Sequence, residues 1–369
     1  MTDVKFCVFC GNPPESKNKE HVLPQWLLKM TGDPRRVVTI GFNYKKQKEI
    51  SFDWTSLVTP ACEACNTEFS VLEGQVRPVI EALLEKKALC SKDYFVLLDW
   101  LDKVRVGLWL NYHMLQGNPT GIDPSFYIKS RLRKKDRFLA VYPMAQDEQG
   151  LNARGVETLA FHGAPSAFGL RINNIFIVNC SSDFLFSARC GFPFPSKMEL
   201  VLDGENAGHM QLGDFSATKK IKYPLLRFSL HKPSVYIFQP IMQEPMSSPL
   251  ETERMFLGGD PKEDEFLVDN TMGEEYPGVG KLYRQTNGRV IRIDDENELI
   301  EFDSITGSEC TTAGVLVSQV YELQNYLQSL YLPLAQSIKV RADWNERQKI
   351  MIKLNKMVVR SLLKKSKPH

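Results

Sequence analysis

Four of the eight cysteines in the chain form two Cys-x-x-Cys pairs, Cys7 with Cys10 and Cys62 with Cys65. Each such turn presents two thiolates to one metal ion, and a second turn brought near it in space completes a tetrahedral shell of four sulfurs. The spacing therefore predicts a structural zinc site. The other four cysteines stand singly among apolar residues, which is typical of core packing.

An acidic residue followed by a histidine, Glu20-His21, lies between the two cysteine pairs, and Asn66 directly follows the second pair. An imidazole with a pKa near neutrality can take a proton from water at physiological pH. Carboxylate and amide oxygens suit a hard cation such as Mg²⁺, which stabilises charge on a phosphate and its leaving group. These residue types can therefore support hydrolysis of a phosphodiester bond by an activated water.

This order of features (CxxC, acidic-His, CxxC-Asn) resembles the HNH (His-Me finger, ββα-metal) endonucleases. It is most similar to zinc-stapled members such as the phage junction-resolving enzymes and many bacterial restriction and defence nucleases. The resemblance covers the N-terminal quarter of the chain. It implies that His21 is the general base, that Glu20 and Asn66 help to hold one divalent metal ion, Mg²⁺ or Mn²⁺, and that the paired cysteines hold a structural Zn²⁺. It also implies a duplex DNA substrate and a role in restriction or defence against phage.

The pattern departs from the family on the helix, where some HNH enzymes have a third histidine. Glu73 lies seven residues after Asn66, about two helical turns, and so shares its helical face. We expect Glu73 to replace that histidine at the catalytic site, with Glu68 as the alternative. Adjacent strand residues point to opposite faces, so Glu20 either ligates from a bulged backbone or only orients other groups. The alternative role of Asn66 is to cap the following helix.

The elements that position these residues follow from periodicity. Two short strand-like segments, 37–40 and 50–54, flank a basic stretch and predict a hairpin inserted between the halves of the zinc site. Apolar residues then recur at helical spacing after Asn66, and Pro78 is expected to kink or divide that helix. A second predicted helix, from about 93 to 116, carries Trp100, Leu101, Val104, Leu108 and Leu115 on one face.

The sequence pattern changes in the remainder of the chain. Short β-like runs occur at 138–142, 169–179, 184–186, 198–202, 235–239, 281–283 and 290–293, an acidic stretch at 251–276 predicts a linker, and a helical section at 312–365 is broken near Pro333. We therefore predict an α+β protein in three parts. These are an HNH module with zinc site and covering helix at 1–118, a mixed α+β recognition or sensing domain at 119–310, and a helical segment with a basic end at 311–369.

Basic clusters are the candidate contacts with DNA phosphates. The hairpin residues Lys45, Lys46 and Lys48 are the first choice, because the hairpin must lie near His21. The stretches 129–137 and 339–367 are further candidates. The C-terminal region is also the predicted contact with a second copy of the chain or with a partner protein.

Composition places few limits beyond these. The chain has 369 residues, 43% of them hydrophobic and 24% charged, with a net charge of +2, as in ordinary globular proteins. No apolar run reaches the roughly 18 residues that a membrane span needs, and the N-terminus does not resemble a signal peptide. We therefore expect a cytoplasmic protein without a membrane partner.

Two function classes follow from the motifs. The first is a metal-dependent endonuclease that acts on DNA. The second is a catalytically silent zinc module that binds nucleic acid or protein. The presence of Glu20, His21 and Asn66 together favours the enzyme, because a binding module needs the cysteines but not these three residues.

Overall fold

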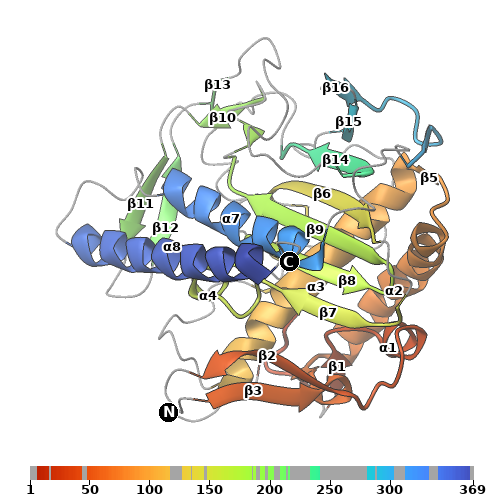
Figure 1. The fold of residues 1–369 in the computed structure, drawn as a ribbon, viewed down its shortest axis with the longest axis horizontal. Helices are drawn as coiled ribbons and strands as arrows, with labels where there is room; N and C mark the ends of the chain where they lie inside the picture. Colours follow the sequence, from red (N-terminus) through yellow and green to blue (C-terminus); the bar gives the residue numbers. More distant parts are fainter. Residues whose placement is uncertain are drawn as a thin grey trace.

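A computed structural model provides the fold and describes residues 6–15, 18–43, 48–116, 127–133, 135–144, 148–184, 186–187, 192–195, 198–202, 208–212, 215–216, 233–241, 281–286, 289–302, 312–331 and 340–365. Helices lie on both sides of a central antiparallel sheet of seven strands (Figure 1). The prediction of a mixed α+β protein is therefore confirmed. The acidic stretch 251–276 and the hairpin residues Lys45 and Lys46 lie outside the described residues.

The sheet has the strand order β16-β15-β14-β6-β9-β8-β7. Its strands are β6 (Asp136–Pro143), β7 (Leu151–Arg154), β8 (Ala167–Ile172), β9 (Ile175–Ser182), β14 (Val235–Gln239), β15 (Tyr283–Thr286) and β16 (Arg289–Arg292). Successive side chains point to opposite faces, so Leu139 and Val141 join one core while Phe138 and Ala140 join the other. Because helices cover both faces, the central strands read as nearly continuous apolar runs.

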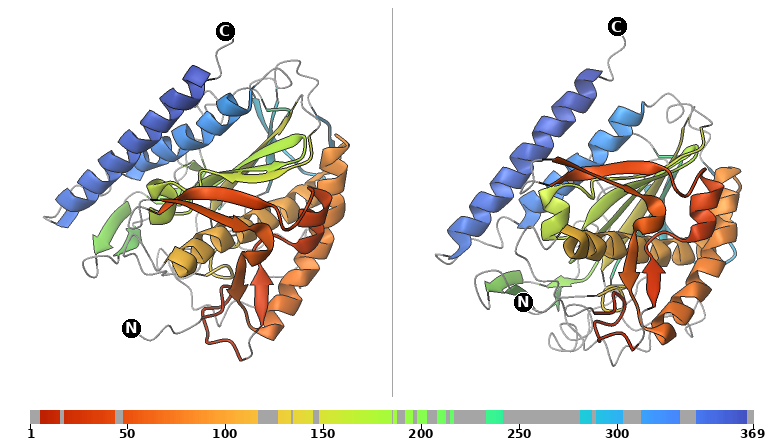
Figure 2. Two further views of the ribbon diagram at one scale, coloured as in Figure 1. Left: turned by 60° about the horizontal axis from the view of Figure 1, so that its bottom comes forward. Right: turned by 90° about the horizontal axis from the view of Figure 1, so that it is seen from below.

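One face of the sheet is covered by α7 (Ala313–Tyr331), and α8 (Val340–Lys365) packs against α7 (Figure 2). Leu316, Val320 and Leu323 of α7 are buried in the core of this face. Gly169 of β8 permits the close approach, because an added Cβ would lie 2.9 Å from the Val320 side chain. The predicted pair of C-terminal helices is thus confirmed.

The opposite face of the sheet is covered by α3 (Ser91–Gln116), and the short α4 (Leu159–Gly163) contacts α3 as well as α7 and α8. Sequence periodicity indicates one apolar stripe on α3, whereas every residue from Val96 to Leu110 is buried. The N-terminal segment packs against one side of α3 and the sheet against the other. The predicted boundaries near 118 and 310 therefore separate segments that pack on a common sheet, and whether any of them folds alone stays a prediction.

The β-like runs predicted in this region differ in outcome. The run 169–179 is the β8–β9 hairpin, which turns through Asn173 at φ 49°. The strand predicted at 184–186 is wrong, because Phe184 has φ 56°, a left-handed conformation that a strand does not allow. Phe184 and Phe186 are buried as core residues instead. Smaller two-stranded pairs join β11 (Met198–Leu202) to β12 (Gly208–Leu212), β10 (Phe194–Pro195) to β13 (Phe215–Ser216), and β5 (Leu89–Cys90) to β17 (Leu299–Ile300).

The N-terminal segment contains β1 (Lys19–His21), α1 (Gln25–Met30), β2 (Val37–Asn43), β3 (Lys48–Asp53), the 3-10 turn η1 (Trp54–Ser56), β4 (Val58–Pro60) and α2 (Glu63–Leu84). The inserted hairpin is confirmed as β2 and β3, which pair antiparallel. Pro78 lies inside α2 without dividing it, so that part of the expectation is wrong. No described helix is long and apolar enough to cross a bilayer.

Candidate functional site

The four paired cysteines converge in space. The sulfur atoms of Cys7, Cys10, Cys62 and Cys65 all lie within 4.8 Å of one another, and those of Cys10 and Cys62 are 3.8 Å apart. A tetrahedral zinc ion with bonds of about 2.3 Å places its sulfurs about 3.8 Å apart. The geometry therefore matches a four-cysteine metal site. The prediction that these four cysteines come together is confirmed.

Local structure forms each half of this cluster. Gly11 closes the first turn at φ 77°, and its amide donates to the carbonyl of Cys7. The second pair spans the start of α2, where the Cys62 backbone amide donates to the sulfur of Cys7 at 3.3 Å. Phe9 stacks on Phe69 of α2 with ring centroids 4.0 Å apart. These contacts fix the two turns against each other.

The thiols of the cluster shift one another's pKa values in opposite directions. A hydrogen bond with the Cys65 thiol lowers the pKa of Cys7 to about 4. Burial raises the pKa of Cys62 to about 12, and the hydrogen bond to Cys7 raises the pKa of Cys65 as well. The thiolate form is thus favoured at Cys7, whereas Cys62 and Cys65 keep their protons. Four thiolates this close together require a cation, which is the charge that a divalent zinc ion supplies.

Strands β1 and β4 bring the acidic-His pair next to the start of α2. They pair antiparallel, with Glu20 opposite Thr59 and His21 opposite Val58. Only two residues, Ala61 and Cys62, separate the end of β4 from α2. The order is therefore two antiparallel strands followed by a helix, with the β2–β3 hairpin inserted between the strands.

A lysine lies between the predicted carboxylates. Lys103 of α3 is 1% exposed, and its ammonium donates to Glu20 Oε1 at 2.6 Å and to Glu73 Oε1. Two carboxylates and one ammonium leave a net charge of −1 in this triad. Burial raises the pKa of Glu73, although the adjacent ammonium opposes that shift. The two glutamates also raise the pKa of Lys103 above its usual value, in spite of its burial.

His21 ends β1 within electrostatic reach of Glu73 and Lys103. Strand β1 pairs with β4 without a bulge, so the bulged backbone considered for Glu20 is not observed, and Glu20 and His21 leave opposite faces of the strand. Burial and the Lys103 charge lower the pKa of His21 below the usual value, and the Glu73 carboxylate partly opposes them. The Nε2 atom lies 3.0 Å from the side-chain amide of Gln25, four residues later on α1. The buried Nδ1 has no hydrogen-bond partner among the described residues. The imidazole is therefore neutral at pH 7, with one ring nitrogen held and the other unengaged.

The three candidate site residues on α2 lie in different surroundings. Asn66 does not cap α2, because Cys62 is the N-cap and Asn66 lies inside the first turns. Asn66 is half-buried, and the seven residues to Glu73 place it about 10 Å away along the helix axis. Glu68 forms an ion pair with Lys129 at 2.5 Å. Glu73 is thus the helix carboxylate that lies close to Glu20, since both contact Lys103. Its predicted role at the catalytic site stays a prediction.

The predicted DNA contacts differ in whether they are exposed or paired inside the fold. Lys48 is exposed at the start of β3. Four of the six basic residues at 129–137 are engaged inside the fold: Lys129 pairs with Glu68, Arg133 with Asp99, Lys135 with Asp183, and Arg137 with Asp99 and Asp102. This stretch is therefore mainly a structural ion-pair layer. Among the described side chains of α8, the exposed basic residues are Arg347, Lys349, Lys353, Lys356, Arg360 and Lys364.

Sequence reasoning did not identify Lys103 or Gln25 as site residues. No local signal singles out Lys103, since it lies near Asp99, Asp102 and Arg105 in the segment 97–110, and charged residues of a helix are ordinarily assigned to its solvent face. Comparison with protein-family models, with characterised proteins and with solved structures finds no match. The proposed activity therefore rests on the residues and their geometry.

Proposed function

We propose that this protein is a metal-dependent HNH-type endonuclease that hydrolyses phosphodiester bonds in DNA. The observation that carries the proposal is the meeting of Glu20 and Glu73 on Lys103, with neutral His21 within electrostatic reach of Glu73 and Lys103. The two glutamates and the histidine come from a β1–β4 strand pair and the helix that follows it. A zinc module that only bound a partner would not need this group of buried titratable side chains.

His21 is the proposed general base. Its lowered pKa keeps the ring neutral at pH 7, as a base that accepts a proton from water requires. Gln25 is the proposed positioning residue. A glutamine side chain can turn either its NH₂ or its carbonyl towards the Nε2 atom. With the carbonyl turned inward, Nε2–H donates to it and the lone pair of Nδ1 is free to take the proton.

Glu20 and Glu73 are the residues that would hold a divalent cation. Their two carboxylates outweigh the single charge of Lys103 by one unit, so the donor set suits a hard cation such as Mg²⁺ or Mn²⁺. When bound, such a cation stabilises negative charge on the phosphate and the leaving oxygen. Lys103 holds the two carboxylates together and limits their mutual repulsion. A role in restriction or in defence against phage is part of the same proposal.

Incubation of purified protein with plasmid, linear duplex, single-stranded DNA and RNA tests the proposal, with and without Mg²⁺ or Mn²⁺. We expect cleavage of DNA that requires the divalent cation and stops with a chelator too weak to remove zinc. One observation favours the silent zinc module, namely that Lys103 already supplies a cation to both carboxylates. Binding of DNA without cleavage under every metal condition would select that class.

The variant Gln25→Glu should move the pH dependence of cleavage. A carboxylate beside the ring stabilises the imidazolium form and raises the pKa of His21. The base is active only when neutral, so the acidic limb of the pH–rate profile should move to higher pH, by about one unit. Gln25→Ala, which adds no charge, is the matched control. Identical acidic limbs in Gln25→Glu and the wild type would contradict the assignment of His21 as the base.

A further inference from the structure

Helix α8 leaves more apolar side chains exposed than it buries. Among its described side chains only Gln348, Asn355 and Val359 are buried, and two of these three are polar. Five apolar side chains are exposed: Ile350, Leu354, Met357, Val358 and Leu363. A helix that only covers a core directs its apolar residues inward and its polar residues outward. Helix α8 therefore has an apolar surface that the described part of the chain does not use.

The contact with α7 fixes which side of α8 faces outward. In the buried interface, Asn355 Nδ2 donates to Gln324 Oε1 of α7 at 3.1 Å. Figure 2 shows α8 at the outer edge of the molecule, with α7 between it and the sheet. Because the buried residues of α8 face α7, the side chains on its other sides point away from the sheet.

Four of the exposed residues form a stripe along α8. Ile350, Leu354, Met357 and Ser361 follow one another at intervals of four, three and four residues, which is the spacing of the a and d positions in a heptad repeat. At about 100° per residue, this apolar stripe lies about 130° around the helix axis from the buried residues. Such a stripe is typical of a surface that packs against another helix.

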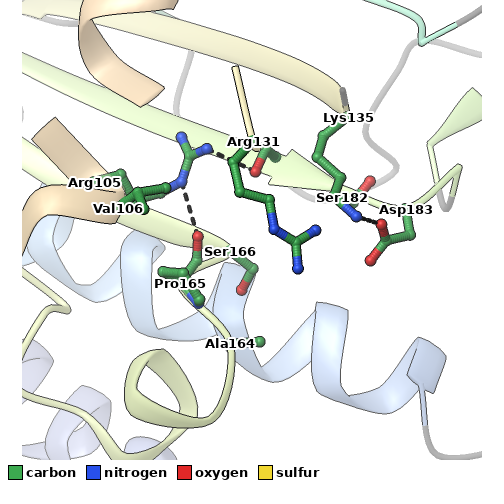
Figure 3. Close-up of a pocket in the computed structure, with 10 residues that line it drawn as sticks. Arg105, Val106, Arg131, Lys135, Ala164, Pro165, Ser166, Ser182 and Asp183 are labelled. Atoms are coloured by element: carbon green, nitrogen blue, oxygen red, sulfur yellow. Dashed lines mark hydrogen bonds and ion pairs between the residues drawn. The ribbon is translucent and has the colours of Figure 1, made fainter. Parts of the chain in front are cut away.

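A row of five exposed basic residues borders the apolar stripe on one side. This basic row spans about 22 Å along the helix and consists of Lys349, Lys353, Lys356, Arg360 and Lys364. None of the five forms an ion pair with a described residue. Basic side chains around the cavity between α3 and the end of β9 differ, since Arg105 donates to the Pro165 carbonyl at 2.8 Å and Lys135 pairs with Asp183 (Figure 3). The charges of the basic row are therefore available to a partner.

Two members of the basic row occupy positions that form ion pairs across a helix–helix contact. With Leu354 at an a position and Met357 at a d position, Lys353 and Arg360 are at g positions. Charges at e and g select the partner helix, because they pair with opposite charges beside its own apolar stripe. A helix that fits α8 should therefore carry apolar residues at a and d and acidic residues beside them.

A second copy of α8 does not fit this pattern. In an antiparallel pair the g positions of the two helices face each other, which would bring Lys353 and Arg360 against the same two residues of the other copy. Like charges opposed in this way are unfavourable. In a parallel pair they would face the e positions, which are Met351 and Val358, and no ion pair would form.

DNA and a membrane surface each match only part of this face. Duplex DNA would contact the basic row through its phosphates but would leave the apolar stripe in water. A helix that lies in a membrane interface characteristically inserts aromatic side chains, and none of the exposed apolar side chains described on α8 is aromatic. A helix with acidic residues beside its apolar stripe matches both features.

We propose that α8 docks an acidic amphipathic helix of a partner protein. The apolar side chains of that helix pack on Ile350, Leu354 and Met357, and its carboxylates pair with Lys353 and Arg360. The partner lies on the opposite side of the sheet from α3, whose Lys103 belongs to the proposed nuclease site (Figure 2). The proposal is independent of the nuclease activity.

Fluorescence anisotropy with the full-length protein and a labelled synthetic peptide tests the proposal. The peptide has three heptads with isoleucine at a, leucine at d and glutamate at e and g, and a second peptide has lysine in place of each glutamate. We expect saturable binding of one glutamate peptide per chain. The lysine peptide should bind about tenfold more weakly or less, because its charges oppose those of the basic row.

Variants of α8 separate the two parts of the contact. Lys353→Glu/Arg360→Glu should weaken binding of the glutamate peptide by about tenfold or more and strengthen binding of the lysine peptide, because it reverses the charges at the g positions. Met357→Asp should weaken binding of both peptides, since it places a carboxylate in the apolar stripe. Lys29→Glu/Lys92→Glu makes the same change in net charge at exposed positions of α1 and α3 and should bind as the wild type does. If the double variant of α8 fails to fold, Met357→Asp decides, since Met357 is 57% exposed.

Absence of saturable binding, or equal affinity for the two peptides in the wild type and in the double variant of α8, would overturn the proposal. Binding to vesicles of phosphatidylserine and phosphatidylcholine without peptide binding would replace the helix by an anionic membrane. A dimer in sedimentation that Met357→Asp dissociates, again without peptide binding, would replace it by a second copy. Binding of duplex DNA alone that the double variant loses would assign the basic row to DNA. His21→Ala should bind the glutamate peptide normally, so that failure of one proposal is distinguishable from failure of the other.

Discussion

Replacement of His21 by alanine is expected to lower metal-dependent DNA cleavage by about 10²- to 10⁴-fold, the usual contribution of a general base. The imidazole is neutral at pH 7 because burial and Lys103 lower its pKa. Removal of the ring costs one hydrogen bond to Gln25 and leaves the Glu20–Lys103–Glu73 triad intact. Zinc content and the midpoint of thermal unfolding should therefore stay near the wild-type values. Initial rates of plasmid cleavage at saturating Mg²⁺ measure the effect.

The matched control is His209→Ala, in β12 of a separate two-stranded sheet. This variant should cleave as the wild type does. A second readout separates chemistry from structure, since added imidazole can occupy the space left by the His21 ring and should restore part of the rate. Full activity in His21→Ala would contradict the assignment of the base. Loss of zinc together with activity would instead indicate a structural role for His21.

Much of the N-terminal arrangement could be predicted from the sequence. Paired cysteines report a local turn with a defined chemistry, and two such turns must meet if they bind one ion. The hairpin and the start of a helix after the second pair also follow from local patterns, and the structure has both. Glu73 was predicted to replace the third histidine of the HNH pattern because it shares a helical face with Asn66. The structure places its carboxylate on Lys103 together with that of Glu20, and its role in catalysis stays a prediction.

The features that could not be predicted depend on long-range contacts. Lys103 reaches Glu20 across 83 residues of sequence, and a lysine in a helix is ordinarily assigned to the solvent face. The same assumption made Asp99, Asp102 and Arg105 look like the polar side of α3. They are buried because Arg133 and Arg137 bring compensating charge from a distant segment. The run 184–186 was assigned to a strand as one of several short β-like runs, although core burial accounts for its two phenylalanines.

These contacts make α3 the element that joins the N-terminal segment to the seven-stranded sheet. Its Lys103 holds the proposed catalytic carboxylates, while Asp102 and Arg105 hold the end of the sheet. The segment 127–133 reinforces this connection, since Ile128 and Lys129 donate to the carbonyls of Val8 and Phe9 in the first cysteine turn. The cysteine cluster and the triad therefore share one packed support, so we expect loss of a metal ion from the cluster to affect more than the cysteines.

Replacement of Cys62 by serine, or of Cys10 by alanine, is expected to abolish zinc binding and to lower the free energy of unfolding by several kcal/mol. In small zinc domains the metal contributes on the order of 10 kcal/mol. The effect here should be smaller, because Phe9, Phe69 and α3 bury a core of their own. Metal analysis of the purified protein and denaturant unfolding measure the two quantities. The wild type should contain one zinc ion per chain and both variants none.

The control for these variants is Cys90→Ser, because Cys90 lies in β5 outside the cluster and its thiol donates to Asp93 at 3.1 Å, a bond that a hydroxyl can replace. It should keep its zinc and most of its stability. Cleavage should be lost in the cluster variants as well, since the zinc ties the turn before β1 to the start of α2 and thereby holds His21 next to Glu73. A Cys62→Ser protein that keeps wild-type stability and activity without zinc would show that packing alone positions the site, and the structural role of the metal would have to be abandoned.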